Sequence, residues 1–171
     1  MHSLDFIHTY FTEEKIESLI FIIIGCIAIL FSCFFWGIIK YSFFKGMSYP
    51  LFCIGLIQVV VGGTVYNRVP KDIERVEQIV KNKTIHLQKT EITRIEIVQQ
   101  NFVIYKWIEM TLMTISSILI VLFYKSPQTF WKGLGLGLLI QASVMLCLDL
   151  IAQQRADIYM LELSKIFQSL T

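Results

Sequence analysis

The sequence predicts an all-α fold of four transmembrane helices in a bundle, with a cytoplasmic helical hairpin between the second and third helices. The first observation is compositional. The 171 residues are 55% hydrophobic and only 16% charged, and the mean hydropathy is +0.63, whereas about 25% of residues are charged in an ordinary soluble domain. The second is that the apolar residues gather in four runs, each close to the ~20 residues needed to cross the hydrocarbon of a bilayer.

The four apolar runs define the predicted spans, which are 16–39, 47–66, 102–124 and 131–152. All of them belong to one integral membrane domain, 1–171, because the chain is short enough for a single domain. The polar region 70–101 has apolar residues at helical spacing on both sides of a predicted turn at 82–84, and therefore predicts the hairpin. The region 153–171 keeps the same spacing and predicts an amphipathic C-terminal helix.

The N-terminal region is polar and acidic, so it is not expected to be a cleaved signal peptide. Leu4, Ile7 and Phe11 are spaced as one face of a helix, which predicts a short helix lying on the membrane surface. Thr12, followed by two glutamates, is the expected N-cap of the first span. Pro50 is expected in the first turn of the second span, where its missing N–H costs little.

Polar and small residues inside the spans should face other helices, because lipid solvates them poorly. The second span carries Gly55, Gln58 and Gly62 on one stripe. The fourth span carries Gly133, Gly137 and Gln141 on one face and Asp149 to the side of it. Small residues four apart let helices approach closely. The fourth span is therefore expected either to pack centrally or to use its glycine pair in a homo-oligomer.

Two segments of the chain match without a gap at a shift of 87 residues. The sequence SFFKG at 42–46 aligns with TFWKG at 129–133, and Asn67-Arg68 aligns with Gln154-Arg155. The second span would then repeat as the fourth, in the same direction across the membrane. Under this alignment Asp149 falls on the stripe of the second span that faces protein.

Five charged residues lie near one boundary of the predicted spans: Arg68, Lys106, Glu109, Asp149 and Arg155. At about 1.5 Å per residue, Glu109 lies roughly 23 Å from Tyr124 and Asp149 roughly 24 Å from Gly133, so the two acids share a depth. We expect Asp149 to pair with Arg68 or Arg155, and Glu109 with Lys106. One interpretation is a ring of ion pairs that fixes helix register. The alternative is a coupling site in which one acid holds a proton.

The residue types needed for a metal site or for catalysis are present but not in the required patterns. The four cysteines, all inside apolar runs, form no CxxC pair, and the three histidines have no partner ligand nearby. No phosphate loop, nucleophile elbow or HExxH motif occurs. The predictions are therefore no catalytic residue, no metal, no cofactor and no enzyme activity. A net charge of +2 without basic clusters also argues against a nucleic-acid partner.

The orientation follows from the positions of the basic residues. The two short loops and their flanks hold Lys40, Lys45, Lys125 and Lys132, and the other eleven Lys and Arg lie in the N-terminus, the hairpin and the tail. Because cytoplasmic segments carry the excess of Lys and Arg, both termini and the hairpin are predicted in the cytoplasm.

Several segments together resemble a family of uncharacterised small bacterial four-span membrane proteins: FFKG at 43–46, GLIQVVVGGTVYNR at 55–68, NFVIYKWIE at 101–109, FWKGLGLGLLIQ at 130–141 and LDLIAQQR at 148–155. The resemblance implies a location in a bacterial inner membrane and carries no activity. The expected function is that of a non-catalytic accessory, immunity or scaffold protein that binds a protein partner through its hairpin. The alternative is a small ion or proton channel or transporter subunit using Gln58, Gln141, Glu109 and Asp149.

Overall fold

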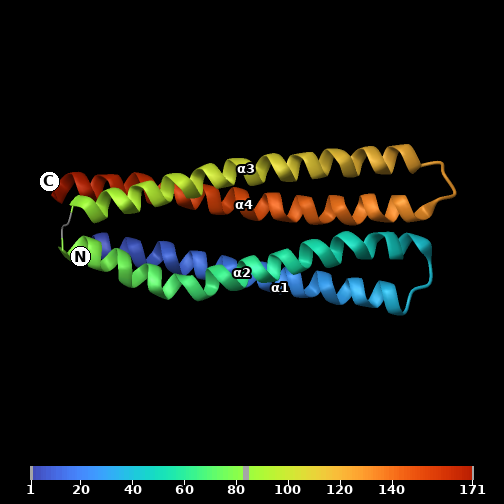
Figure 1. The fold of residues 1–171 in the computed structure, drawn as a ribbon, viewed down its shortest axis with the longest axis horizontal. Coiled ribbons are helices and arrows are strands. Elements are labelled where there is room, and N and C mark those ends of the chain that lie inside the picture. The colour runs from blue at the N-terminus through green and yellow to red at the C-terminus, as the bar shows by residue number, and fades with distance from the viewer. Residues whose placement is uncertain (1, 83–84, 171) are drawn as a thin grey trace.

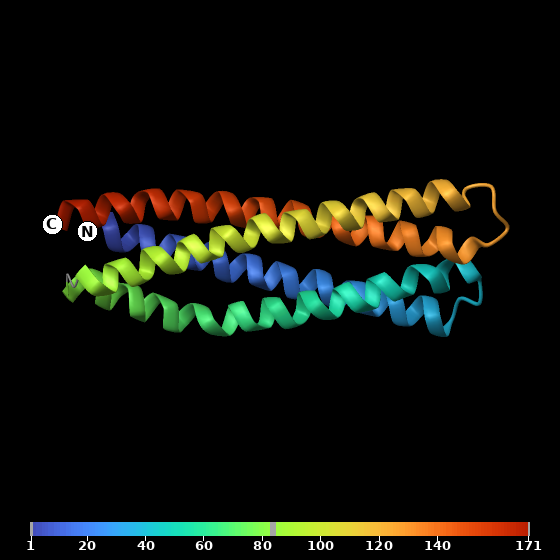
Figure 2. The same cartoon turned by 45° about the horizontal axis from the view of Figure 1, so that its top comes forward.

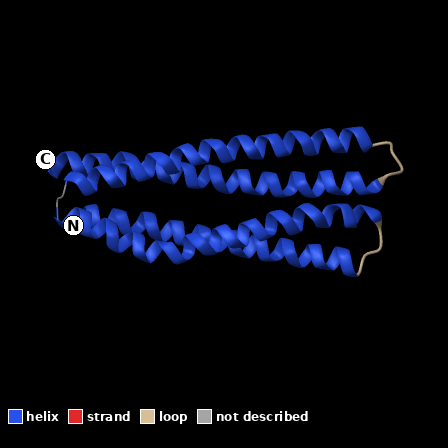
Figure 3. Cartoon of the chain, viewed as in Figure 1, coloured by secondary structure: helices blue, strands red, loops and turns tan. Residues whose placement is uncertain are grey.

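The fold was described from a computed structural model, which gives the backbone of 2–82 and 85–170 and the side chains of 6–79 and 89–165. It contains four long helices: α1 (His2–Gly37), α2 (Ser42–Asn82), α3 (Ile85–Phe123) and α4 (Thr129–Leu170). The all-α four-helix prediction is confirmed, and each helix is long and apolar enough to span a membrane. Figure 3 shows helix along nearly the whole chain. The predicted turn at 82–84 falls largely outside the described residues.

The helices form two antiparallel hairpins, α1–α2 and α3–α4, that lie side by side (Figures 1 and 2). Both short connections, 38–41 and 124–128, lie at one end of the bundle, and both termini lie at the other. The main contact between the hairpins is made by α2 and α4, while α1 and α3 lie on the outside. The fourth span therefore packs centrally, as one of the two sequence-based interpretations expected.

The helices are nearly twice as long as a membrane is thick. They contain 36, 41, 39 and 42 residues, which at about 1.5 Å per residue gives roughly 54–63 Å, against hydrocarbon about 30 Å thick. We call the part at the connecting-loop end the membrane half (16–66 and 102–152). The part at the termini end is the head, which comprises 2–15, 67–82, 85–101 and 153–170.

The two halves bury different residues. In the membrane half large apolar side chains point outward, for example Leu30 and Leu122, each 69% exposed in the absence of lipid. An apolar surface of this extent on all sides of a bundle requires a bilayer around it. The head instead has a conventional core, in which Ile7, Phe11 and Tyr159 are fully buried. The chain is therefore an integral membrane protein with a folded extension beyond the bilayer.

Three boundary predictions were wrong. α1 runs without a break from His2, so the separate surface helix is not formed and Thr12 is an exposed residue inside a helix instead of an N-cap. The reason is that Ile7 and Phe11 enter the head core against α2, α3 and α4. α2 begins at Ser42, before the predicted start, and places Pro50 beyond its first turn. The helix starts early because residues 43–47 pack against the start of α4.

The hairpin predicted over 70–101 is helical, but its two arms pack mainly on other helices. The arm from α2 packs against α1, and the arm from α3 packs against α4. α2 also continues through Pro70 without ending. The predicted C-terminal helix over 153–171 is the continuation of α4. Together the N-terminal segment, the hairpin and the tail form a four-helix head.

The contact between α2 and α4 repeats the sequence shift of 87 residues. A Cβ atom on Gly46 would overlap the backbone carbonyl of Phe130, and a Cβ atom on Gly133 would overlap that of Phe43. These contacts are reciprocal, because the shift converts 46 into 133 and 43 into 130. The starts of the two helices, Ser42 and Thr129, obey the same shift. The repeat in the sequence therefore corresponds to a pseudo-twofold axis between α2 and α4.

The glycine stripes are used within the chain. A Cβ atom on Gly137 would lie 2.8 Å from the Met47 carbonyl oxygen, and Gly62 and Gly55 are equally tight against α1, on Ser18 and Gly25. The alternative in which Gly133 and Gly137 form a homo-oligomer is therefore wrong, since α2 already covers them.

We predict that Gly133→Ala lowers the free energy of unfolding by about 1–3 kcal/mol, because overpacking must push α4 away from the backbone of α2. The measurement is thermal or denaturant unfolding in detergent, followed by circular dichroism.

The matched control is Gly63→Ala. Nothing lies within 4 Å of a Cβ atom at Gly63, so alanine should leave stability unchanged or raise it by up to about 1 kcal/mol through helix propensity. Equal effects of the two substitutions would contradict the packing at Gly133.

Candidate functional site

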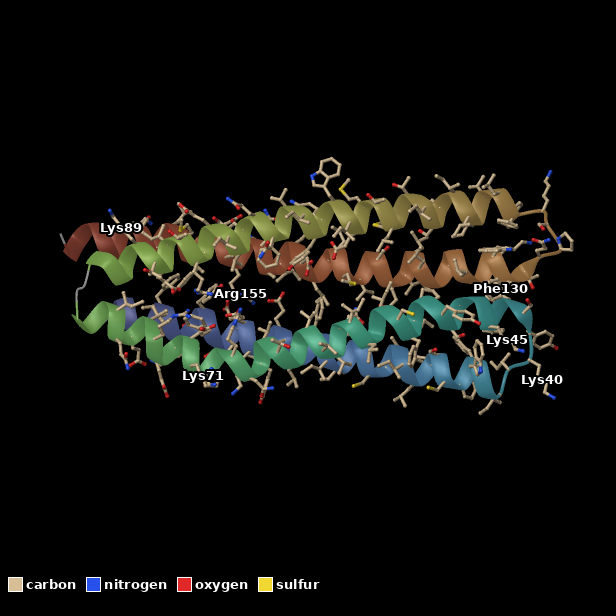
Figure 4. The ribbon with its side chains drawn as sticks, viewed as in Figure 1. Lys40, Lys45, Lys71, Lys89, Phe130 and Arg155 are labelled. Carbon is tan, nitrogen blue, oxygen red and sulfur yellow. The ribbon has the colours of Figure 1, made fainter. Side chains whose placement is uncertain are left out.

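A cavity of about 240 Å³ lies between the two hairpins at the boundary of the membrane half and the head. We call it the axial cavity. Five charged side chains line it: Glu14 and Glu17 from α1, Arg68 from α2, and Asp149 and Arg155 from α4. α3 completes the wall with Val98, Asn101, Phe102 and Tyr105. In Figure 4, Arg155 lies between the hairpins, far from Lys40 and Lys45 at the connecting-loop end.

The cavity follows the pseudo-twofold axis. Many of its lining residues are related in pairs by the shift of 87: Gly62 with Asp149, Val65 with Ala152, Arg68 with Arg155, Glu14 with Asn101, and Ser18 with Tyr105. Equivalent positions on the two hairpins thus face each other across one space. The prediction that Asp149 lies on the protein-facing stripe agrees with this arrangement.

Both arginines of the cavity pair with acids from the N-terminal segment. Arg155 forms an ion pair with Glu17 in which both side chains are mostly buried. Arg68 contacts Glu14 and Asp72, at 2.9 Å each. The predicted pairs of Asp149 with Arg68 or Arg155 are therefore wrong. The sequence places Glu14 and Glu17 at the start of the first span, but it does not show that this part of α1 packs against the two arginines.

Asp149 instead lies next to Glu109 of α3, close enough for the two carboxyl groups to interact. Glu109 is 1% exposed, and among the described residues no donor reaches either of its oxygens. The predicted pair of Lys106 with Glu109 is therefore wrong, because the half-buried lysine lies one turn nearer the head and makes no ion pair with it. The shared depth of the two acids, by contrast, is as predicted.

The two glutamines of the predicted cluster are buried but do not line the axial cavity. Gln58 is fully buried, and neither its amide nitrogen nor its oxygen has a hydrogen-bond partner in the described part of the chain. Its Cβ packs 3.0 Å from the position of a Cβ on Gly25, so it faces α1. Gln141 is buried on α4. The predicted cluster is therefore not one site. Arg68 and Arg155 line the axial cavity, Asp149 lines it and lies next to Glu109, and the two glutamines lie elsewhere.

A second polar cluster, in the head, was not predicted. Glu91 of α3 is 2% exposed and accepts hydrogen bonds from Arg94 at 2.6–3.1 Å. Arg75 of α2 reaches the same carboxylate at 3.3 Å, and the Tyr159 hydroxyl of α4 reaches it at 3.5 Å. Burial, and then the negative charge of Glu91, raise the pKa of Tyr159, so its hydroxyl stays a donor at neutral pH. Glu91 therefore joins three helices.

Two signals could have pointed to this cluster. Glu91 lies three residues before Arg94 and Asp72 three before Arg75, the spacing of ion pairs on one helix. The sequence does not show, however, that the two pairs face each other. Tyr10 of α1 also packs on this cluster, because its ring stacks on that of Tyr159 with centroids 3.9 Å apart.

The axial cavity thus brings together three carboxyl and two guanidinium groups, and the head cluster joins Glu91 to two arginines and a tyrosine hydroxyl. In the part of the chain that the structure describes, no group of three His, Cys, Asp or Glu side chains is placed to hold a metal ion.

Comparison with protein-family models, with curated proteins and with solved structures found no match to this chain. The resemblance to bacterial four-span proteins therefore stays a prediction.

We predict that Glu91→Ala lowers the free energy of unfolding by about 1.5–3 kcal/mol, because its partners lose hydrogen bonds to a buried charged group. The matched control is Glu162→Ala. Glu162 pairs with Lys165 one turn away on the surface of α4, and such exposed pairs contribute about 0–1 kcal/mol. Unfolding of both variants in detergent measures the difference. Equal losses would show that the Glu91 cluster does not hold the head together.

Proposed function

We propose that the protein is a non-catalytic accessory membrane protein, of the immunity or scaffold type, which binds a protein partner through its head. The observation that carries the proposal is the head itself. Ion pairs and stacked rings join its four helices from within: His8 with Glu77, Arg68 with Glu14, Arg75 with Glu91, and Tyr10 on Tyr159. A body cross-linked in this way loses little conformational freedom on binding, which favours recognition.

The outer faces of the head present polar side chains at helical spacing. On α2 these are Lys71, Glu74 and Gln78, and on α3 they include Lys89 and Glu96, all exposed. Lys71 and Lys89 lie toward the termini end of the molecule in Figure 4. Both charge signs alternate along each face. This pattern suits a protein partner better than a nucleic acid, which would call for a surface of one sign.

The resemblance implies a bacterial inner membrane, and the distribution of basic residues supports a head and both termini in the cytoplasm. The connecting-loop end carries four lysines, and the remaining Lys and Arg lie toward the head. A homo-oligomer in this membrane would use the lipid-facing side chains of α1 or α3, because the glycine stripes of α2 and α4 are occupied.

The second candidate function is a small ion or proton channel or transporter subunit. The axial cavity favours it, since charged residues within a membrane protein commonly mark an ion or proton path. Reconstituted protein would then carry a proton or cation current. Partner binding through the head requires no current.

The first function predicts that a photo-crosslinking amino acid placed at Glu74 or Glu96 captures one protein in native membranes, in a fixed ratio to this chain. The same amino acid at Gln128, in the connecting loop, should capture none. Charge reversal at Lys71 on the neighbouring turn should reduce capture at Glu74 by about tenfold or more, the effect of losing ~1.4 kcal/mol.

The measurement is mass spectrometry of the cross-linked bands. Capture only of abundant membrane proteins, equally from head and loop positions, would reject partner binding by the head. Cysteines at the same loop and head sites provide the topology control. Gln128→Cys should react with an impermeant maleimide on intact cells, and Gln78→Cys only after permeabilisation.

A further inference from the structure

Glu109 and Asp149 are neighbouring acids in the membrane half, and neither forms an ion pair within the described residues. Four carboxyl groups, those of Glu14, Glu17, Glu109 and Asp149, gather at the axial cavity with two guanidinium groups. Both guanidinium groups are engaged elsewhere, Arg155 by Glu17 and Arg68 by Glu14 and Asp72. Lys106, one turn from Glu109 on α3, forms no ion pair with it either, so no ion pair within the described residues neutralises the acid pair.

The groups that face the pair come from every helix. α1 contributes Glu14 and Glu17, α2 contributes Arg68, α3 contributes Tyr105, and α4 contributes Arg155. Of these, Glu17 is close enough to be repelled by Asp149. The negative surroundings thus add to the mutual repulsion of Glu109 and Asp149.

Two carboxylates in contact cannot both stay ionised in a low-dielectric site, and sharing one proton relieves the repulsion. A hydrogen bond between two carboxyl groups also requires a proton on one of them, since an ionised carboxylate is an acceptor only. Glu109 and Asp149 can therefore form a hydrogen bond with each other only if one of the two carboxyl groups is protonated.

The first hairpin gives an internal comparison. At the shift of 87, Gly62 corresponds to Asp149 and Ile22 corresponds to Glu109. Gly62 packs closely on Ile22 of α1, where an added Cβ would lie 2.9 Å from the Ile22 Cγ1. The equivalent positions thus hold Gly62 and Ile22 in the first hairpin and the two acids in the second. The first hairpin therefore packs at this position without acids.

We propose that Glu109 and Asp149 bind one proton between them, taken up from water on the head side through the axial cavity. Asp149 lines the cavity and Glu109 lies behind it. A cavity of about 240 Å³ has room for several waters, each of which occupies about 30 Å³ of liquid volume. The proton adds to one carboxylate oxygen, and the other carboxylate accepts the resulting O–H hydrogen bond.

Infrared difference spectroscopy of the full chain in lipid nanodiscs tests the proposal. The wild type should show the carbonyl stretching band of a protonated carboxylic acid at neutral pH and lose it at alkaline pH. Glu109→Gln combined with Asp149→Asn should lack that band. Glu162→Gln, which removes an exposed acid of the head, should keep it. A wild type without the band at neutral pH, or a double variant that keeps it, would overturn the proposal.

A second variant shows whether loss of the band can be separated from loss of the fold. Glu109→Ile with Asp149→Gly copies the first hairpin, and it should fold with wild-type helicity and lack the band. If this variant fails to fold, the acids are structural and the proposal is wrong. The assay contains no partner and no ion gradient, so its outcome is separate from that of partner binding and from that of transport.

Discussion

The fold depends on the contact of backbone with backbone between α2 and α4. The Cα atoms of Gly46 and Gly133 each lie against a backbone carbonyl of the other helix, so closely that no side chain fits at either position. In a membrane, where association of helices gains little from the hydrophobic effect, such close packing is a main source of stability. The contact aligns the two hairpins on one pseudo-twofold axis. The axial cavity lies on the same axis and is lined by equivalent residues of the two hairpins.

Away from this contact the bundle has to accommodate charge. The axial cavity lies at the boundary of the membrane half and the head. Its arginines bind Glu14 and Glu17 of α1 and Asp72 of α2 instead of Asp149 of α4. Burying an ion without a partner costs several kcal/mol, so the N-terminal segment has a direct role in closing the head. The acid pair makes no ion pair, because both arginines of the cavity are engaged by other acids.

Much of the fold could be predicted from the sequence. The four apolar runs predicted the four helices, and the match of SFFKG with TFWKG predicted the register that Gly46 and Gly133 show. The errors have one physical origin. Helical spacing shows that Ile7 and Phe11 share a face, but not whether that face meets lipid or protein. In the same way, the sequence shows the depth of each charged residue but not which partner its helix meets, so Arg68 and Arg155 were paired with Asp149 and not with Glu14 and Glu17.

Disulfide cross-linking in native membranes can show whether the two hairpins of a single chain pack about one axis. A Cβ atom at Gly137 would lie 2.8 Å from Cγ of Pro50, so cysteines at these two positions come within reach of a disulfide. The account predicts an intramolecular cross-link for Pro50→Cys with Gly137→Cys, and none for Pro50→Cys with Gly63→Cys. A cross-linked dimer, or no cross-link from the first pair, would contradict it.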